Sequence, residues 1–194
     1  MEIVLASESP RRRELLALMG LRFTVDPSHA EEEPPRHETV AENVMALAEQ
    51  KALAVLPRHP GACVIGADTV VDLDGLVLGK PHTPENAKAY LTRMRGRTHT
   101  VFTGIAVVTP KGVRKAYEET RVTFAPLSER EIDWYVSTGE PLDKAGAYGI
   151  QGPACAFVSR IEGDYFNVIG MPVRLLYTLL REEGILAEDR TCPA

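Results

Sequence analysis

Residues 5–16 of the 194-residue chain read LASESPRRRELL, a short apolar segment that passes through small polar residues into a basic helix start. Pro10 suits the first helical position, because the N–H that proline lacks would have no intrahelical partner there, and Ser9 can act as the N-cap. The free N–H groups of the first turn, the positive end of the helix dipole and three arginines would then converge. The stretch predicts either an anion site suited to a polyphosphate or an ordinary turn with exposed arginines.

Composition indicates one globular domain. Hydrophobic residues make up 44% and charged residues 25% of the chain, and the net charge of −5 argues against a general nucleic-acid surface. No apolar run approaches the roughly 18 residues of a membrane span, and the N-terminal arginines follow the apolar segment, unlike those of a signal peptide. The three cysteines form no C-x-x-C pair, and we expect Cys63 and Cys155 to be free cysteines buried in the core. This use of cysteine is typical of a protein in the reducing cytoplasm.

The rest of the chain alternates predicted helices and strands, with capping boxes that begin at Thr39 and at Ser128. We expect a short strand at 63–67 to end at Asp68, residues 140–152 and 163–170 to be irregular, and the tail from about 187 to be loose. The predicted strands lie at residues 3–6, 21–25, 63–67, 76–78, 98–108, 113–124 and 157–161, and the helices at 10–19, 39–57, 83–94, 128–139 and 172–183. This order, with central hairpins, predicts an α/β fold with a mixed, twisted sheet flanked by helices.

Several charged residues stand near the ends of these elements. Burying the Asp68 carboxylate would be costly unless it is paired, protonated or bound to a metal ion. The alternative is a structural role, in which Asp68 caps the following turn. The run Glu31-Glu32-Glu33 is either a solvated face or a site, and Lys51 and Lys80 are either exposed or phosphate ligands. Taken together, these are the residue types of phosphoryl chemistry, in which cations neutralise phosphate oxygens and carboxylates hold a hard cation such as Mg²⁺.

Six segments, in order, resemble the signatures of the Maf family of nucleoside triphosphate pyrophosphatases. They are LASESPRRRELL at 5–16, GADTVV at 66–71, LGKP at 78–81, HTVFTG at 99–104, EPLDKAGAYGIQG at 140–152 and GDYFNVIGMP at 163–172. The resemblance implies a cytoplasmic, metal-dependent hydrolase that converts a nucleoside triphosphate to the monophosphate and pyrophosphate. It also implies one Maf-like domain over residues 1–194, with two lobes around a cleft as in the inosine triphosphate pyrophosphatases, and a homodimer.

The resemblance also assigns roles to residues. It places the catalytic proton acceptor on Asp68 and the second functional carboxylate on Glu32, with Glu31 as a neighbouring alternative. These carboxylates would hold Mg²⁺ or Mn²⁺. The family's polyphosphate-binding positions fall on five residues of this chain: Ser7, Arg11, Arg12, Lys51 and Lys80.

Substrate choice in the family resembles a three-position code. The dTTP- and UTP-specific subgroup carries Arg, Thr and Gln, which match Arg11, Thr69 and Gln151, whereas the 7-methyl-GTP subgroup carries Trp, Gln and Glu. The Gln151 amide both donates and accepts, so it could pair with the N3–H and O4 edge of thymine or uracil. Arg13 is expected to point elsewhere. The alternatives are a 7-methyl-GTP pyrophosphatase and a binding regulator of septum formation, and the sequence does not rank dTTP against UTP.

Overall fold

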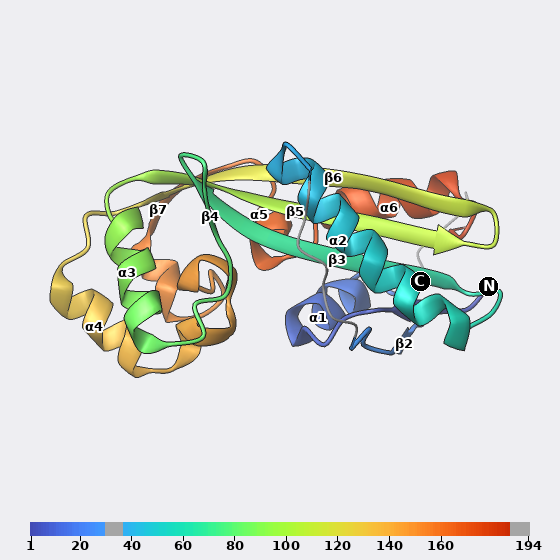
Figure 1. Ribbon diagram of the computed structural model, residues 1–194, viewed down its shortest axis with the longest axis horizontal. Helices are drawn as coiled ribbons and strands as arrows, with labels where there is room; N and C mark the ends of the chain where they lie inside the picture. Colours follow the sequence, from blue (N-terminus) through green and yellow to red (C-terminus); the bar gives the residue numbers. More distant parts are fainter. Residues whose placement is uncertain (30–36, 187–194) are drawn as a thin grey trace, which may run out of the picture. The chain divides into compact units, whose positions relative to one another are not determined.

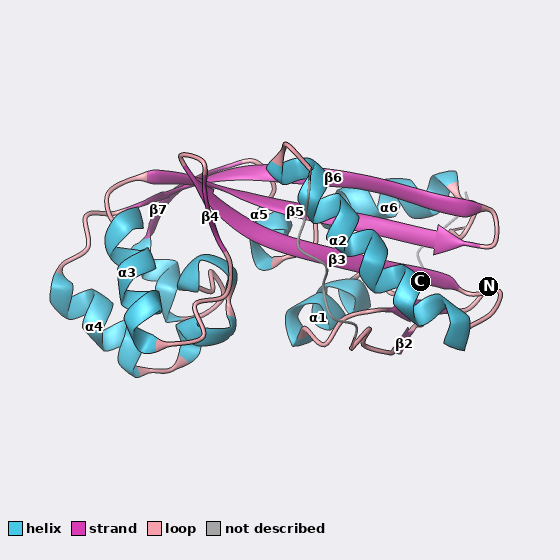
Figure 2. Cartoon of the chain, viewed as in Figure 1, coloured by secondary structure: helices cyan, strands magenta, loops and turns pink. Residues whose placement is uncertain are grey.

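The computed structural model describes residues 1–29 and 37–186, which build a seven-stranded sheet flanked by helices (Figures 1 and 2). The strand order is β2-β1-β3-β5-β6-β7, and β4 pairs with β3 outside this path. Strand β1 is parallel to β2 and β3, whereas β3 with β4 and β6 with β7 are antiparallel. The predicted mixed α/β class is confirmed.

Most of the predicted elements are present in the described chain. The strands are β1 (Ile3–Leu5), β2 (Thr24–Val25), β3 (Cys63–Leu73), β4 (Leu76–Leu78), β5 (Thr98–Thr109), β6 (Gly112–Phe124) and β7 (Val158–Glu162). The α-helices are α1 (Pro10–Leu18), α2 (Val40–Val55), α3 (Pro84–Met94), α4 (Glu129–Ser137), α5 (Tyr165–Ile169) and α6 (Val173–Glu182). Short 3-10 turns occupy η1 (Leu56–Arg58), η2 (Glu140–Asp143), η3 (Ala145–Ala147) and η4 (Pro153–Phe157). No helix among the described residues is long and apolar enough to cross a membrane.

The chain divides into two compact units. The first comprises residues 1–68, 104–117 and 170–194, and the second comprises residues 69–103 and 118–169. Strands β3, β5 and β6 each contribute residues to both units, and the division in β3 falls between Asp68 and Thr69.

In the first unit, α2 runs along the sheet against β3 and β5 (Figure 1). Glycines allow this close approach, because a Cβ at Gly66 would lie 2.0 Å from the carbonyl oxygen of Ala48, and one at Gly104 would lie 2.4 Å from the carbonyl group of Val44. Apolar side chains of α2 and the sheet then bury one another. The core cluster there contains Val4, Ala6, Ala52, Val55, Ala62, Val64 and Val108.

In the second unit, helices α3 and α4 contact each other beside the turns of residues 140–157. Tyr148 lies in a buried aromatic cluster with Phe124 and His99, whose rings meet edge to face. The Nε2 atom of His99 lies 2.9 Å from the hydroxyl of Tyr148. This contact anchors the turns to the sheet, since His99 is on β5.

Burial of His99 makes stability depend on pH, because it lowers the pKa of the imidazole from 6.5 to about 4. Between these values the unfolded chain binds more protons, so stability falls as pH falls, by at most ~1.4 kcal/mol per pH unit. We expect the free energy of unfolding in urea to drop by about 2 kcal/mol from pH 7.5 to pH 5 through this residue. His99→Gln should remove that part of the slope, and an unchanged slope in the variant would contradict the assignment.

Two expected boundaries were wrong because tertiary contacts override local signals. Strand β3 continues past Asp68 to Leu73, so Asp68 lies within the strand and not at its end. The β-branched residues at positions 69–71 favour this extension. The predicted strand at 21–25 is reduced to Thr24–Val25, which pairs with the end of β1.

Two further expectations were also wrong. Residues 163–170, expected to be a loop, contain α5 (Tyr165–Ile169), whose first turn is stabilised by a 2.7 Å hydrogen bond from the Phe166 N–H to the Asp164 carboxylate. Cys63 is buried as expected, but Cys155 is exposed in η4. The apolar neighbours of Cys155 in the sequence therefore did not predict its burial.

Candidate active site

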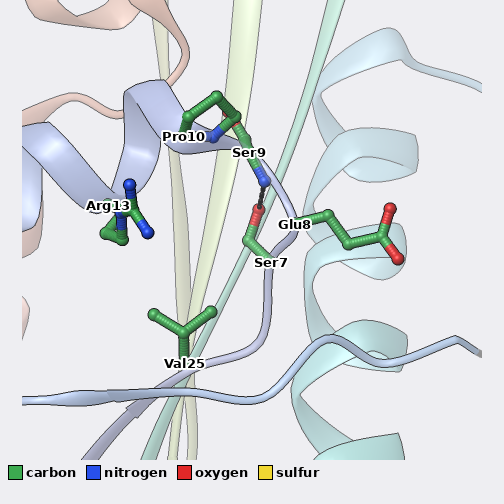
Figure 3. A pocket seen from close by; sticks show the side chains of 6 residues that line it. All are labelled: Ser7, Glu8, Ser9, Pro10, Arg13 and Val25. Carbon is green, nitrogen blue, oxygen red and sulfur yellow. Dashed lines mark hydrogen bonds between the residues drawn. The ribbon is translucent and has the colours of Figure 1, made fainter.

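The start of α1 has the capping geometry that the sequence predicts. Ser9 is the N-cap, its hydroxyl accepts from the Arg12 N–H at 3.5 Å, and Pro10 opens the helix. The Ser9 N–H in turn donates to the Ser7 hydroxyl at 3.2 Å, which closes a tight turn at the end of β1 (Figure 3). The helix N-terminus therefore faces the short connection from β1.

A pocket adjoins this turn. Figure 3 shows the Arg13 side chain on α1 and Val25 on the neighbouring strand among the residues that line it. Arg13 is exposed, and the described lining of this pocket does not contain Arg12 or Asp68, so the expectation that Arg13 points away from the phosphate-binding residues stays a prediction. The lining also contains Ser7, Glu8, Ser9 and Pro10.

The Arg12 guanidinium donates hydrogen bonds to three segments of the first unit. Its Nε donates to the carbonyl of Gly170 at 2.9 Å, and one terminal nitrogen donates to the carbonyl of Ala67 at 2.9 Å and to the Ser7 hydroxyl at 3.3 Å. Ala67 directly precedes Asp68 on β3. Arg12 therefore fixes the end of β1 relative to the predicted catalytic carboxylate.

Asp68 is paired with Lys51. The Lys51 Nζ lies 2.5 Å from the Asp68 Oδ1, and both side chains are largely buried, at 14% and 12% exposed. Lys51 comes less than one turn after Ala48, the residue that α2 packs against Gly66 of β3. The sequence left several alternatives open for Asp68, and the structure shows the one in which the carboxylate is paired. Asp68 does not cap a turn, because β3 continues beyond it.

The predicted metal ligands are Asp68 and Glu32, with Glu31 as the alternative to Glu32. Glu31 and Glu32 lie outside the described residues. Within the described parts of the chain, no group of three or more His, Cys, Asp or Glu side chains could hold a metal ion. One or two carboxylates nevertheless suit Mg²⁺, which usually completes its coordination with substrate phosphates and waters. The donor type of Asp68 fits such a cation.

Three of the remaining predicted residues belong to the second unit. Thr69 on β3 has its hydroxyl 3.0 Å from that of Thr103 on β5. Lys80 is exposed, and the preceding carbonyl of Gly79 accepts from the Gly146 N–H at 3.1 Å. Gln151 is exposed in the turn before η4. The segment of Lys80 is therefore attached to the turns that precede Gln151.

Contacts that the sequence analysis missed hold the turn of Gln151. The Gly149 N–H donates to the hydroxyl of Tyr135 at 3.1 Å, and the Gly152 N–H donates to the carbonyl of Gly149 at 3.1 Å. A Cβ at Gly152 would lie 2.1 Å from Oε1 of Glu140, so the carboxylate packs directly on this turn. The two glycines on either side of Gln151 were the only sequence signal for this packing.

The structure thus connects four predicted residues in the first unit by direct or adjacent contacts: Ser7, Arg12, Lys51 and Asp68. Arg11 is half-buried in the first turn of α1. The second unit holds Thr69, Lys80 and Gln151. An arginine–lysine–carboxylate group of this kind at a helix N-terminus can bind an anion and accept a proton beside it.

Comparison with known proteins gives consistent results. The family model described as Maf-like protein matches residues 2–183. The chain is 53% identical over 188 residues to a dTTP/UTP pyrophosphatase of Moorella thermoacetica, covering 95% of this chain and 96% of the relative. It is 48% identical over 184 residues to a dTTP/UTP pyrophosphatase of Bacillus pumilus, covering 95% and 97%.

A solved structure shares the fold. The Ham1 protein of Staphylococcus aureus superposes with a TM-score of 0.54 at 15% sequence identity, over 94% of this chain and 100% of that chain. This likeness concerns the fold alone.

Proposed function

Because the chain belongs to the Maf family, we propose that it is a nucleoside triphosphate pyrophosphatase that hydrolyses dTTP and UTP to the monophosphate and pyrophosphate. The observation that carries the proposal is the buried pair of Asp68 and Lys51, beside the helix start that Arg12 fixes. Relatives about half identical over nearly the whole chain bear the name dTTP/UTP pyrophosphatase, which supports the substrate class.

In the proposed reaction, a water oxygen bonds to the α-phosphorus while the bond from that phosphorus to the α,β-bridging oxygen breaks. Asp68 accepts the proton of the attacking water, and Lys51 holds the carboxylate in place at 2.5 Å. Pyrophosphate leaves with the bridging oxygen. The cationic side chains would neutralise its developing charge: Arg11, Arg12 and Lys80.

A divalent cation is part of the proposal. Asp68, together with Glu32, would hold Mg²⁺ or Mn²⁺, and when bound the cation would neutralise phosphate charge. Base selection is assigned to Arg11, Thr69 and Gln151. The Gln151 amide, exposed in a turn that Glu140 and Tyr135 support, would pair with the imide edge of uracil or thymine.

A nucleotide panel tests the function. We expect the protein with Mg²⁺ or Mn²⁺ to release pyrophosphate from dTTP and UTP, with kcat/KM at least tenfold above that for CTP and 7-methyl-GTP. One missing hydrogen bond in a desolvated site accounts for about tenfold. Product analysis must show the monophosphate and intact pyrophosphate. Preference for 7-methyl-GTP would contradict the base assignment, and no release from any nucleotide would favour a binding role. The cytoplasmic location, single domain and homodimer stay predictions.

A further inference from the structure

Residues 144–152, here called the Tyr148 turn, contain the short helix η3 and no strand. Two backbone N–H groups of the turn donate to segments that are distant in the sequence. The Gly146 N–H donates to the carbonyl of Gly79 at 3.1 Å, and the Gly149 N–H donates to the hydroxyl of Tyr135 at 3.1 Å. A segment outside the strand ladders can open while the sheet stays intact. The side-chain contacts of the Tyr148 turn therefore decide whether it stays closed.

Part of the backbone of this turn is strained. Gly146 and Ala147 both have a positive φ, of 66° and 61°, and Ala147 is completely buried. A residue with a Cβ seldom adopts this conformation, which persists only where the surrounding contacts enforce it. The ring of Tyr148, the next residue, packs edge to face against His99 and Phe124. The insertion of Tyr148 therefore holds the strained backbone in place.

The contact between Tyr148 and His99 fits the neutral imidazole. The Nε2 atom lies 2.9 Å from the Tyr148 hydroxyl, whereas the Nδ1 atom is buried without a hydrogen-bond partner among the described residues. In the charged form both ring nitrogens carry protons. The Nδ1–H of an imidazolium would then be buried without an acceptor, which is unfavourable. The closed turn therefore accepts the neutral ring and disfavours the charged one.

Within the described chain, no charged side chain compensates a positive charge on His99. Phe124 of β6 and Tyr148 of the turn pack against the ring. Burial, and then the neighbouring Tyr135 of α4, raises the pKa of Tyr148, so its hydroxyl stays neutral. Burial alone lowers the pKa of His99 from 6.5 to about 4. The closed turn therefore loses stability as the pH falls from 6.5 toward 4.

The Tyr148 turn carries or contacts two residues of the proposed site. Gln151 lies within it, and the carbonyl of Gly79, next to Lys80, accepts a hydrogen bond from it. We infer that the turn opens and closes as one local segment, and that neutral His99 latches it shut through Tyr148, so that a proton on the imidazole releases it. Because His99 is 2% exposed, it is a positioning residue and does not contact the nucleotide. The link to catalysis rests on the proposed function, whereas the latch itself does not.

Hydrogen exchange tests the latch. Protection factors of the amides of residues 146–152, corrected for the intrinsic pH dependence of exchange, are compared at pH 7 and pH 5. We expect the opening equilibrium to rise about 20-fold at the lower pH, because the open turn binds a proton with a pKa of 6.5 and the closed turn with a pKa of about 4. The Ala125 N–H, which donates to the carbonyl of Phe157 at 2.8 Å in the same unit, should keep its protection. An equal loss at Ala125 would overturn the inference, because the whole unit would then be unfolding.

Matched variants isolate His99. His99→Gln takes up no proton and should remove the pH dependence of the turn. His59→Gln is the control, since His59 lies 2.9 Å from Asp26 in the first unit and its loss should leave that dependence as in the parent. If His99→Gln folds poorly, Tyr148→Phe keeps the ring, removes the hydroxyl and should raise opening at pH 7 by about 3- to 10-fold. The inference is overturned if His99→Gln keeps the pH dependence, or if Tyr148→Phe exchanges as the parent does.

The link to catalysis has a separate readout. With Mg²⁺ and the non-hydrolysable α,β-imido analogue of UTP at 100 times its Kd, opening of the turn at pH 7 should fall by about 100-fold, because the nucleotide binds only the closed form. If calorimetry shows binding but exchange from the turn is unchanged, His99 does not position residues of the site, and that part of the inference is overturned. A nucleotide that does not bind would overturn the proposed function instead, and the comparison of pH 7 with pH 5 would still decide the latch.

Discussion

Asp68→Asn is expected to lower kcat for dTTP and UTP by about 10²- to 10⁴-fold at saturating Mg²⁺, the range typical for loss of a general base. The amide keeps the shape of the side chain but cannot accept the proton of the attacking water. It also leaves the Lys51 ammonium without its 2.5 Å carboxylate partner in a largely buried position. Steady-state pyrophosphate release measures kcat, and a metal titration ensures that weaker cation binding is not mistaken for slower chemistry.

Asp133→Asn is the matched control. Asp133 also pairs with a lysine at 2.5 Å, that of Lys88, but the two side chains are 54% and 48% exposed on α4 and α3. Exposed ion pairs contribute little to folding stability. This variant should therefore stay folded and keep kcat within about twofold of the parent. If Asp68→Asn retains kcat within about threefold, Asp68 is not the proton acceptor.

Local chemistry was enough to predict most of the helices. The capping boxes at Thr39 and Ser128 form as expected, and each begins a helix. Ser9 and Pro10 start α1 in the same way. These signals work because a cap satisfies backbone N–H groups within three residues of itself, so no distant contact is needed.

Distant contacts explain the errors. Asp68 looks like a strand end, because an unpaired carboxylate is unfavourable in a buried strand. Its partner Lys51 stands 17 residues earlier, and only the packing of α2 on Gly66 brings it close. The Arg12 bond to Gly170 joins residues 158 positions apart. The sequence was therefore enough to predict the residue types of the site, but it did not predict which of these residues bind one another.

Gly66→Ala is expected to have the largest effect on stability. Its Cβ would lie 2.0 Å from the carbonyl oxygen of Ala48, a backbone atom that cannot rotate away as a flexible side chain could. Helix α2 would have to shift from β3, and overpacking of this kind costs about 3 kcal/mol or more of unfolding free energy. Urea unfolding measures the change. Gly79→Ala is the control, since a Cβ there meets nothing within 4 Å, and it should change stability by less than ~0.5 kcal/mol.

The same substitution also tests how the site is built. Lys51 follows Ala48 by three residues on α2, and Asp68 follows Gly66 by two residues on β3, so a helix displaced from Gly66 also carries Lys51 away from Asp68. At temperatures where Gly66→Ala is still folded, kcat should therefore fall as well. A variant that loses stability but keeps the parent kcat would show that the 2.5 Å pair is not needed for the reaction. Gly66 would then serve the fold alone.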